Sequence, residues 1–440
     1  MGVGLKEWQN TSATTTFISY LFNLEPESLK KGSYKSNYWT SLTNLMHDKK
    51  YPSNWIHIYI KDTLVPNAII ARSLIKKFNA KNNGREVHVT LASFLSLKII
   101  FNTLKDWIKV NKANKYIGTK IKAHCDYLWP LLVKDYNDSF TGIPAINNLV
   151  YFNLFESAMS NLPVQKKGCY LQENISWEFS LISNWKSFGH KANLIGFPHA
   201  SIIYWDLRNF FDRRIYCSKD KANLPLPDFI GMNGDAAKNM YLSGDYPVND
   251  LIDLESLRYL YLSNFSHSRV KEFSSSNDSK VVLVVGDYLK ENTYKQLEML
   301  SSALTGIHKS VHFIIKPHPA GQITLEKYSN LQFELSYKPM EDLLKISDIV
   351  YSSLITSAAV DAYCANLPII TFLDGNTLNM SPLRGVKGVY FVRNSEELSV
   401  AINSIDVTET NLEENYFYLD QKLPRWSQWL DEDLIKINKV

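Results

Sequence analysis

Short apolar runs alternate with helical periodicity through the second half of the chain, and this alternation constrains the fold more than any other feature of the sequence. The expected strands are 280–285, 311–315, 331–335, 348–351, 367–372 and 388–392. The expected helices between them are 292–304, 340–345 and 356–365. Strands and helices that alternate at this spacing form a parallel sheet covered by helices on both faces. We therefore predict a doubly wound, Rossmann-like domain with a parallel sheet of about six strands.

The first 270 residues show the same alternation with more insertions. The expected strands and helices are 55–60, 67–78, 86–91, 94–110, 168–171, 175–188, 193–196 and 227–230. A chain of 440 residues is too long for one ordinary hydrophobic core, because single cores stop growing below this length. The sequence therefore predicts an α/β protein with two Rossmann-like domains that face a cleft.

A polar, serine-rich stretch at 273–279 marks the clearest domain boundary, because it has little to bury. The expected first domain, second domain and C-terminal segment are 1–270, 271–410 and 411–440. From Leu412 onward the pattern is helical, and it includes Trp426 and Trp429. We expect this segment to form a helix that packs back on the first domain.

Composition and missing motifs narrow the classes of function. The formal net charge of +4 is small for this length and does not imply a nucleic-acid binder. The four cysteines form no CxxC pair, which argues against a zinc site or a disulfide framework and fits a reducing cytoplasm. No secretory signal and no apolar run long enough to span a bilayer is expected. The absence of GxxxxGK[ST], GxGxxG and HExxH argues against P-loop phosphoryl transfer, a simple dinucleotide dehydrogenase and a zinc protease.

Lys316-Pro317-His318-Pro319 follows one of the expected strands and is the strongest candidate for an anion site. Lys316 and His318 can both donate to phosphate, and the proline on either side of the histidine stiffens the turn. The plainer alternative is a strand end with a structural histidine. Polar groups at the carboxyl edge of a parallel sheet are well placed to bind a phosphate-bearing ligand, and a nucleotide is the first candidate.

A second group of polar residues follows the strand at 348–351. Hydroxyl groups and free backbone N–H groups at a helix N-terminus favour phosphate oxygens, although plain N-capping explains the same residues. Asp361, one turn into that helix, could accept a hydrogen bond from a ribose hydroxyl or be a solvated carboxylate, and Glu341 and Asp342 could touch a base or ribose. The candidate ligand-binding residues of this domain are therefore Lys316, His318, Pro319, Ser352, Ser353, Thr356, Ser357 and Asp361.

The first domain offers two candidates for a general base. Glu173 stands where a strand meets a helix and could take a proton from an acceptor hydroxyl, or simply stabilise the first turn of the helix. Glu178, five residues on, is expected to point elsewhere. His199, which ends the run Gly-Phe-Pro-His, is a second base candidate or an acceptor contact. Asp206 and Arg208 are expected to form a structural ion pair.

A basic stretch lies on the helix expected from residue 94 onward. Its plain interpretation is a solvated helix face, and the alternative is a surface that meets anionic lipid, worth about 1 kcal/mol per well-placed lysine. The stretch surrounds Trp107, is relieved only by Asp106, and consists of Lys105, Lys109, Lys112, Lys115, Lys120 and Lys122.

Taken together, these features resemble GT-B glycosyltransferases. More narrowly, Lys-Pro-His-Pro followed by Ser-Ser resembles bacterial sialyltransferases and Kdo transferases, which use CMP-activated sugars. The resemblance implies that His318, Ser352 and Ser353 hold the CMP phosphate. In those families the base is an acidic residue followed by glycine, whereas this chain has Glu173-Asn174. Glu-Asn-x-x-Trp-Glu and Gly-Phe-Pro-His also look like segments of bacterial surface-carbohydrate biosynthesis proteins, and the resemblance extends roughly from residue 55 to 400.

The resemblance implies an inverting, metal-independent glycosyltransferase. Its second domain would bind a CMP-activated ulosonic acid, which is Kdo or a nonulosonic acid such as pseudaminic, legionaminic or sialic acid. Its first domain would bind a glycan or lipid-linked glycan of a capsule, O-antigen or lipopolysaccharide. No cofactor beyond the donor, no metal and no nucleic acid is expected. We expect a cytoplasmic protein, with peripheral contact at the inner face of the cytoplasmic membrane through Lys105 to Lys122.

Other activities fit the same residues. One group uses a different donor: a UDP-sugar in a transferase or 2-epimerase, or CDP-glycerol in a teichoic-type transferase. Another is a non-catalytic module that binds a nucleotide sugar within a capsule assembly complex.

Overall fold

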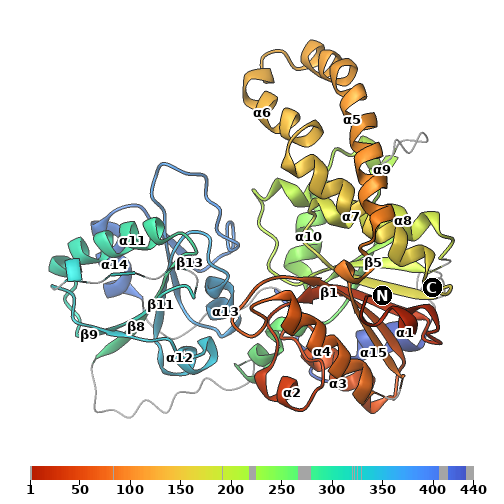
Figure 1. Cartoon of the computed structure of the whole chain (residues 1–440). Helices are drawn as coiled ribbons and strands as arrows, with labels where there is room; N and C mark the ends of the chain where they lie inside the picture. The colour runs from red at the N-terminus through yellow and green to blue at the C-terminus, as the bar shows by residue number, and fades with distance from the viewer. Residues whose placement is uncertain are drawn as a thin grey trace.

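The chain forms two α/β domains, which lie side by side in the computed structural model (Figure 1). The described residues are 2–82, 84–190, 192–217, 224–265, 279–319, 321, 323–324, 326–328, 330–405 and 415–432. The predicted boundary at 273–279 lies, apart from Ser279, outside the described residues. The limits predicted at 270 and 410 also lie outside them.

The first domain is built on a seven-stranded parallel sheet with the order β3-β2-β1-β4-β5-β6-β7. Its strands are β1 (Thr15–Leu21), β2 (Ser53–Tyr59), β3 (Glu86–Thr90), β4 (Lys167–Gln172), β5 (Asn193–Pro198), β6 (Phe229–Met232) and β7 (Leu251–Asp253). Every residue of β1 is buried. The sequence analysis missed β1 and β7.

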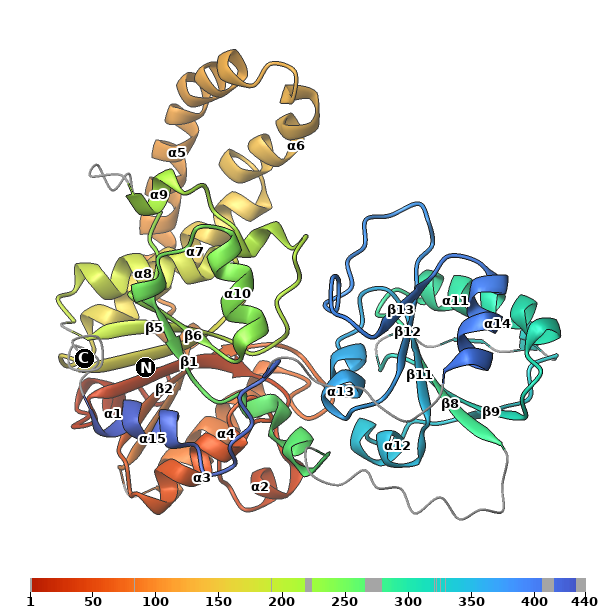
Figure 2. The same cartoon turned by 180° about the vertical axis from the view of Figure 1, so that it is seen from behind.

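Helices cover both faces of this sheet. They are α1 (Leu5–Gln9), α2 (Pro26–Lys30), α3 (Thr40–Asp48), α4 (Ala68–Lys81), α5 (Leu97–His124), α6 (Trp129–Phe140), α7 (Ile143–Ser160), α8 (Ser176–Ser187), α9 (Arg214–Cys217) and α10 (Asp235–Ser243). Helices α1, α3 and α4 lie on one face, and α7, α8 and α10 lie on the other (Figures 1 and 2). The far ends of α5 and α7 and the whole of α6 project from the domain as a helical arm. The helix expected to end at residue 110 therefore continues to His124.

The second domain has a six-stranded parallel sheet with the order β10-β9-β8-β11-β12-β13. Its elements are β8 (Lys280–Val285), α11 (Lys290–Ala303), β9 (Val311–Lys316), β10 (Phe333–Leu335), α12 (Met340–Ile346), β11 (Ile349–Ser352), α13 (Ala358–Cys364), β12 (Ile369–Phe372), β13 (Val389–Val392) and α14 (Ser395–Ser404). Helices α11 and α14 cover one face, and α12 and α13 cover the other (Figures 1 and 2). The predicted doubly wound fold is confirmed.

Two segments pack together where the chain passes between the domains. The first is the 3₁₀ helix η4 (Leu257–Phe265), and the second is 415–423, which precedes α15 (Pro424–Asp431). Ser256 N–H donates to Tyr418 O at 2.8 Å, and the ring of Phe417 stacks on Tyr259 at 4.1 Å. Phe417 belongs to the hydrophobic core of the second domain, as does Tyr259.

The C-terminal helix packs against the first domain, as predicted, because Trp426 and Trp429 are buried in that domain's core. The prediction that the whole segment from residue 412 is helical is wrong for 415–423, because the helix begins only at Pro424. Proline lacks the N–H that a helix interior requires, so it favours the first helical position.

Candidate functional site

In each sheet the order of the strands reverses next to the first strand, and this reversal defines where a ligand can bind. The neighbours at this point are β1 and β4 in the first domain and β8 and β11 in the second. In open α/β sheets, ligands bind outside the carboxyl ends of the strands at such a switch point. Glu173 directly follows β4, and Tyr20 lies at the end of β1. In the second domain Ser353 directly follows β11, and Asp287 lies two residues after the end of β8.

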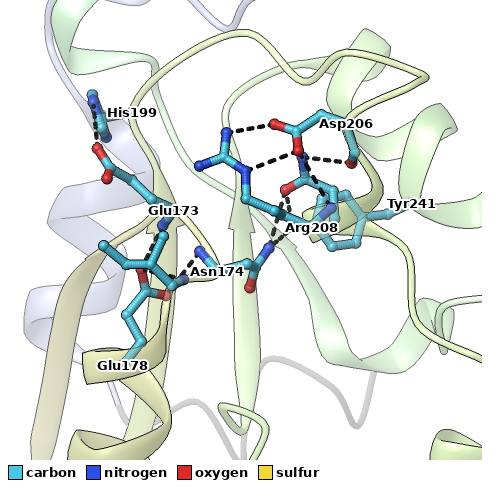
Figure 3. A network of polar contacts seen from close by, with 9 residues as sticks. Glu173, Asn174, Glu178, His199, Asp206, Arg208 and Tyr241 are labelled. Carbon is cyan, nitrogen blue, oxygen red and sulfur yellow. Dashed lines mark hydrogen bonds and ion pairs between the residues drawn. The ribbon is translucent and has the colours of Figure 1, made fainter. Parts of the chain in front are cut away.

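Glu173 has an accessible carboxylate that is held in place by neighbours. The Tyr20 hydroxyl donates to Glu173 Oε2 at 3.2 Å, and Trp177 Nε1–H donates to the Tyr20 oxygen at 3.2 Å. Glu173 Oε1 lies 3.6 Å from His199 Nε2 (Figure 3). The Glu173 side chain is 34% exposed, so an acceptor can reach it. Burial, with the charge of Glu173, raises the pKa of Tyr20 above its ordinary value, so that Tyr20 remains a donor.

His199 is almost fully buried, and its ring packs edge-on against Tyr38 at 4.6 Å. Burial, with the charge of Arg258, lowers the pKa of His199 to about 3. The imidazole is therefore neutral at physiological pH and is a weak base. Its proximity to Glu173 is not an ion pair, since an ion pair requires a charged ring. Of the two predicted base candidates, Glu173 has the chemistry that a base needs.

Glu178 shapes the turn that presents Glu173. Its carboxylate accepts from the backbone N–H groups of Glu173, Asn174 and Ile175 at 2.8, 3.1 and 3.3 Å. Asn174 has a φ of 54°, in the left-handed region that asparagine tolerates better than most residues. Both Glu178 oxygens are occupied, and the residue is 1% exposed. Glu178 therefore positions Glu173 and does not face an acceptor. This agrees with the expectation that Glu178 points away from the site.

A pH-dependent stability is expected from Glu178. Burial raises its pKa from 4.5 to about 8, against the opposing effect of its backbone hydrogen bonds. The folded protein binds this proton more tightly than the unfolded chain does. The contribution of Glu178 to the free energy of unfolding is therefore full below pH 4.5 and is lost as the pH rises toward 8. Relative to Glu178→Gln, the wild-type free energy of unfolding should fall by about 1.4 kcal/mol per pH unit within this window. Urea unfolding at several pH values measures the difference, and parallel pH profiles for the two proteins would contradict it.

A polar network fixes the loop that follows His199 against this turn (Figure 3). Asn174 Nδ2 donates to Asn209 Oδ1 at 3.0 Å and to the Tyr241 hydroxyl at 3.4 Å. Arg208 makes two hydrogen bonds to the Asp206 carboxylate, at 2.9 and 2.6 Å. The structural ion pair expected between Asp206 and Arg208 is confirmed.

The turn after β9 places His318 near the switch point of the second sheet. His318 is half-buried, and its ring lies edge-on to Tyr288 at 5.4 Å. Burial lowers its pKa, partly offset by the carboxylate of Asp287. Lys316 Nζ donates to Lys338 O at 2.6 Å, and burial lowers its pKa as well. Pro319 is exposed beside the histidine.

The hydroxyl groups of the two serines at the end of β11 lie within hydrogen-bonding distance of other side chains of the protein. Ser353 Oγ donates to Asp287 Oδ2 at 2.9 Å, and Ser352 Oγ lies 3.0 Å from Thr371 Oγ1. Both serines are buried. The serines therefore tie β11 to its neighbouring segments, and their predicted contact with phosphate stays a prediction.

Thr356 and Ser357 lie half-buried before α13. Thr356 Oγ1 accepts from the Ala358 N–H at 3.3 Å, whereas Ser357 makes no side-chain cap. Asp361, further along α13, is buried, so the alternative of a solvated carboxylate is wrong. Its Oδ2 accepts from the Tyr261 hydroxyl at 2.8 Å, while Oδ1 has no hydrogen-bond partner in the described part of the chain. Burial raises its pKa to about 6.

Arg258, which was not predicted from the sequence, lies on η4 between the two domains. The guanidinium is exposed, stands 5.5 Å from the ring centroid of Tyr259, and forms no ion pair among the described residues. Beside the larger effect of burial, its charge contributes to the pKa of His199 in one domain and of His318 and Asp361 in the other. Arg258 therefore places a cation between the two halves of the candidate site.

A second arginine contacts the other domain directly. The Arg384 guanidinium, in the loop between β12 and β13, lies 4.4 Å from the ring centroid of Tyr204 and 5.7 Å from that of Trp205. Both aromatic residues follow His199 in the first domain. No motif marks Arg384 or Arg258 in the sequence, since each is a single basic residue in an irregular segment.

Two pockets among the described residues are lined by neither Glu173 nor His318. One pocket of about 560 Å³ lies beside Tyr294, and another of about 530 Å³ lies beside Lys167. Over the described ranges, no cluster of three or more His, Cys, Asp or Glu side chains could hold a metal ion. Within the same ranges, none of the helices is both long and apolar enough to cross a bilayer.

Comparison with known proteins shows no matching family model and no matching curated protein. Solved structures with a related arrangement include the UDP-GlcNAc 2-epimerase of Neisseria meningitidis, at 11% identity and a TM-score of 0.46, over 96% of this chain and 100% of that one. The α,α-trehalose 6-phosphate synthase of Burkholderia multivorans aligns at 10% identity and a TM-score of 0.47, over 97% and 96%. The lipopolysaccharide outer core galactosyltransferase WaaB aligns at 10% and 0.45, over 88% and 89%.

Proposed function

We propose that this protein is an inverting, metal-independent glycosyltransferase that moves a CMP-activated ulosonic acid to a bacterial surface glycan. The observation that carries the proposal is the exposed Arg258 guanidinium on η4, whose charge acts on His199 of one domain and on His318 of the other. A base on one side and donors to an anion on the other are the two requirements of sugar transfer from an activated phosphate.

The proposed reaction gives each domain a separate role. Glu173 takes the proton of an acceptor hydroxyl, while Tyr20 keeps the carboxylate oriented. The hydroxyl oxygen attacks the anomeric carbon from the face opposite the leaving group, and the bond from that carbon to the phosphate oxygen breaks. Arg258 and His318 donate to the oxygens of the departing CMP. Removing one such donor typically costs about 3 kcal/mol in the transition state.

A CMP-ulosonate suits cationic and N–H donors in particular. It carries one phosphodiester and one sugar carboxylate, so the ligand presents two separate anions. Arginine binds either group with two parallel N–H bonds. A half-buried imidazole with a lowered pKa still has one N–H to donate when it is neutral.

We propose that the acceptor is a glycan or lipid-linked glycan bound by the first domain. Glu173, on that domain, has the exposure that an acceptor hydroxyl requires. A lipid-linked acceptor also requires contact with the membrane that holds it. We propose that this contact is peripheral and at the inner face of the cytoplasmic membrane.

Calorimetric titration with CMP, UDP, CDP and GDP, without added metal, tests the donor. We expect CMP to bind most tightly, and Arg258→Ala to weaken that binding by roughly 10- to 100-fold, because one charge-assisted contact is worth about 1.5–3 kcal/mol. Arg72→Ala, at an exposed position on α4, is the matched control and should leave the affinity unchanged. A preference for UDP would replace the proposal with a UDP-sugar enzyme, and the absence of binding to any nucleotide would leave a non-catalytic module.

A further inference from the structure

Helix α5 exposes a row of large apolar side chains along one side. Leu97 is 74% exposed, Phe101 69% and Leu104 51%. Ile100 and Ile108 continue the row at 46% and 50%. The five residues follow the spacing i, i+3, i+4, i+7 and i+11, which places them on one face of a helix. We call them the apolar stripe.

The face that α5 turns toward the protein is a different one, since the buried residues of the helix are Ile99 and Thr103. The apolar stripe is therefore not part of the domain core. Monomeric proteins rarely leave contiguous apolar surface uncovered unless it binds something.

A row of lysines runs beside the apolar stripe. Lys98, Lys105 and Lys109 each directly follow a stripe residue, so they lie roughly 100° further around the helix. All three are exposed, as are the four other lysines of α5. The helix has seven lysines and a single acidic residue, Asp106, which pairs with Lys109 at 3.0 Å. The exposed side of α5 is thus strongly positive next to its apolar stripe.

This combination favours one occupant over the alternatives. An apolar face bordered by lysines is typical of helices that lie in the plane of a membrane, with the apolar side chains among the acyl chains and the lysines on phosphate groups. A second copy of the chain fits less well, because a two-fold interface brings the same patch of both copies together and would oppose their lysine rows. Negatively charged lipid complements both features.

We propose that α5 binds the surface of an anionic membrane through the apolar stripe and the adjacent lysines. The stripe and the lysines include none of the residues assigned to the reaction. The helical arm that contains the far part of α5 projects from the first domain (Figures 1 and 2).

Sedimentation with vesicles tests the proposal on the full chain. We expect binding to phosphatidylcholine mixed with phosphatidylglycerol, weakened by high salt, and little binding to phosphatidylcholine alone. The double variant Lys105→Gln/Lys109→Gln should bind about 30-fold more weakly, because each lysine near an anionic surface strengthens binding about fivefold. Phe101→Ser/Ile108→Ser should also lose binding, because it removes apolar contact without changing charge.

Matched controls lie on α4 of the same domain. Lys76→Gln/Lys77→Gln removes two exposed lysines, and Ile69→Ser removes an apolar side chain that is 78% exposed. Both should bind vesicles like the wild type, and all variants should retain the wild-type nucleotide affinity and melting temperature. Equal binding to both vesicle types, or none, would overturn the proposal. So would a dimer that dissociates in Phe101→Ser/Ile108→Ser without any vesicle binding, since the occupant would then be a second copy.

Discussion

Glu173→Gln is expected to lower the rate of sugar transfer by a factor between about 10² and 10⁴, the usual contribution of a general base. The amide has the same shape as the carboxylate and can still accept from the Tyr20 hydroxyl, so the turn should keep its conformation. Nucleotide affinity should stay within about twofold, because Glu173 lies on the opposite domain from His318. The measurement is the nucleotide released from the preferred sugar donor in the presence of a glycan acceptor.

Two further variants separate a base from a positioning residue. Tyr20→Phe removes one hydrogen bond to Glu173 and should lower kcat modestly, with little change in KM for the donor. Glu27→Gln, an exposed glutamate on α2, should behave like the wild type. If Glu173→Gln transferred sugar at the full rate, Glu173 would not be the base. If the wild type itself showed no transfer, the binding-module alternative would gain support.

Trp426→Ala is expected to lower the free energy of unfolding of the first domain by about 3–5 kcal/mol, the usual cost of truncating a buried tryptophan. Trp426 is fully buried, and its ring lies 4.9 Å from Phe197 and 6.2 Å from Trp39. Its indole N–H also donates to Glu255 O at 2.9 Å. The truncation removes one of the contacts that hold α15 against the sheet, while Trp429 remains buried.

The first turn of α15 is also stabilised by Glu255. The buried Glu255 carboxylate accepts from the backbone N–H groups of Arg425 and Trp426 at 3.0 and 3.1 Å, which satisfies donors that the first helical turn leaves free. Differential scanning calorimetry should resolve the transition of the first domain in Trp426→Ala from that of the second. Gln428→Ala, on the exposed side of α15, is the control and should change neither transition. An unchanged profile for Trp426→Ala would show that α15 does not stabilise the sheet.

The regular second domain was predictable because its central strands β8, β11 and β12 are largely apolar runs buried on both faces. β8 and β12 differ from their predicted ranges by no more than two residues. The central strand β1 was not predictable in the same way. Its threonines and serine are buried, and they form hydrogen bonds that only the folded chain supplies, such as Thr16 Oγ1 to Gln165 Oε1 at 2.8 Å. Because these polar residues interrupt the apolar pattern, β1 could not be recognised as a core strand from the sequence.

The candidate site was likewise only partly predictable from the sequence. Glu173 and His318 follow strands that were recognised, so their positions at the sheet edges could be predicted. The pKa of His199 could not, because it depends on burial by segments far away in the sequence. Asp361 was recognised, but its bond to Tyr261 joins residues 100 positions apart. Arg258 lies in a segment without strand or helix periodicity, and only the fold places it between the domains.

The paired passages of chain between the domains, at η4 and 415–423, determine how the cleft can move. A single connecting segment would leave the second domain free to twist in any direction. Two segments that are joined by the Ser256–Tyr418 hydrogen bond and the Tyr259–Phe417 stack resist twisting of one domain against the other. We therefore expect any closing of the two domains to be a swing about one axis. Such a swing would bring Glu173 and the turn at His318 together along one arc, which this joint determines.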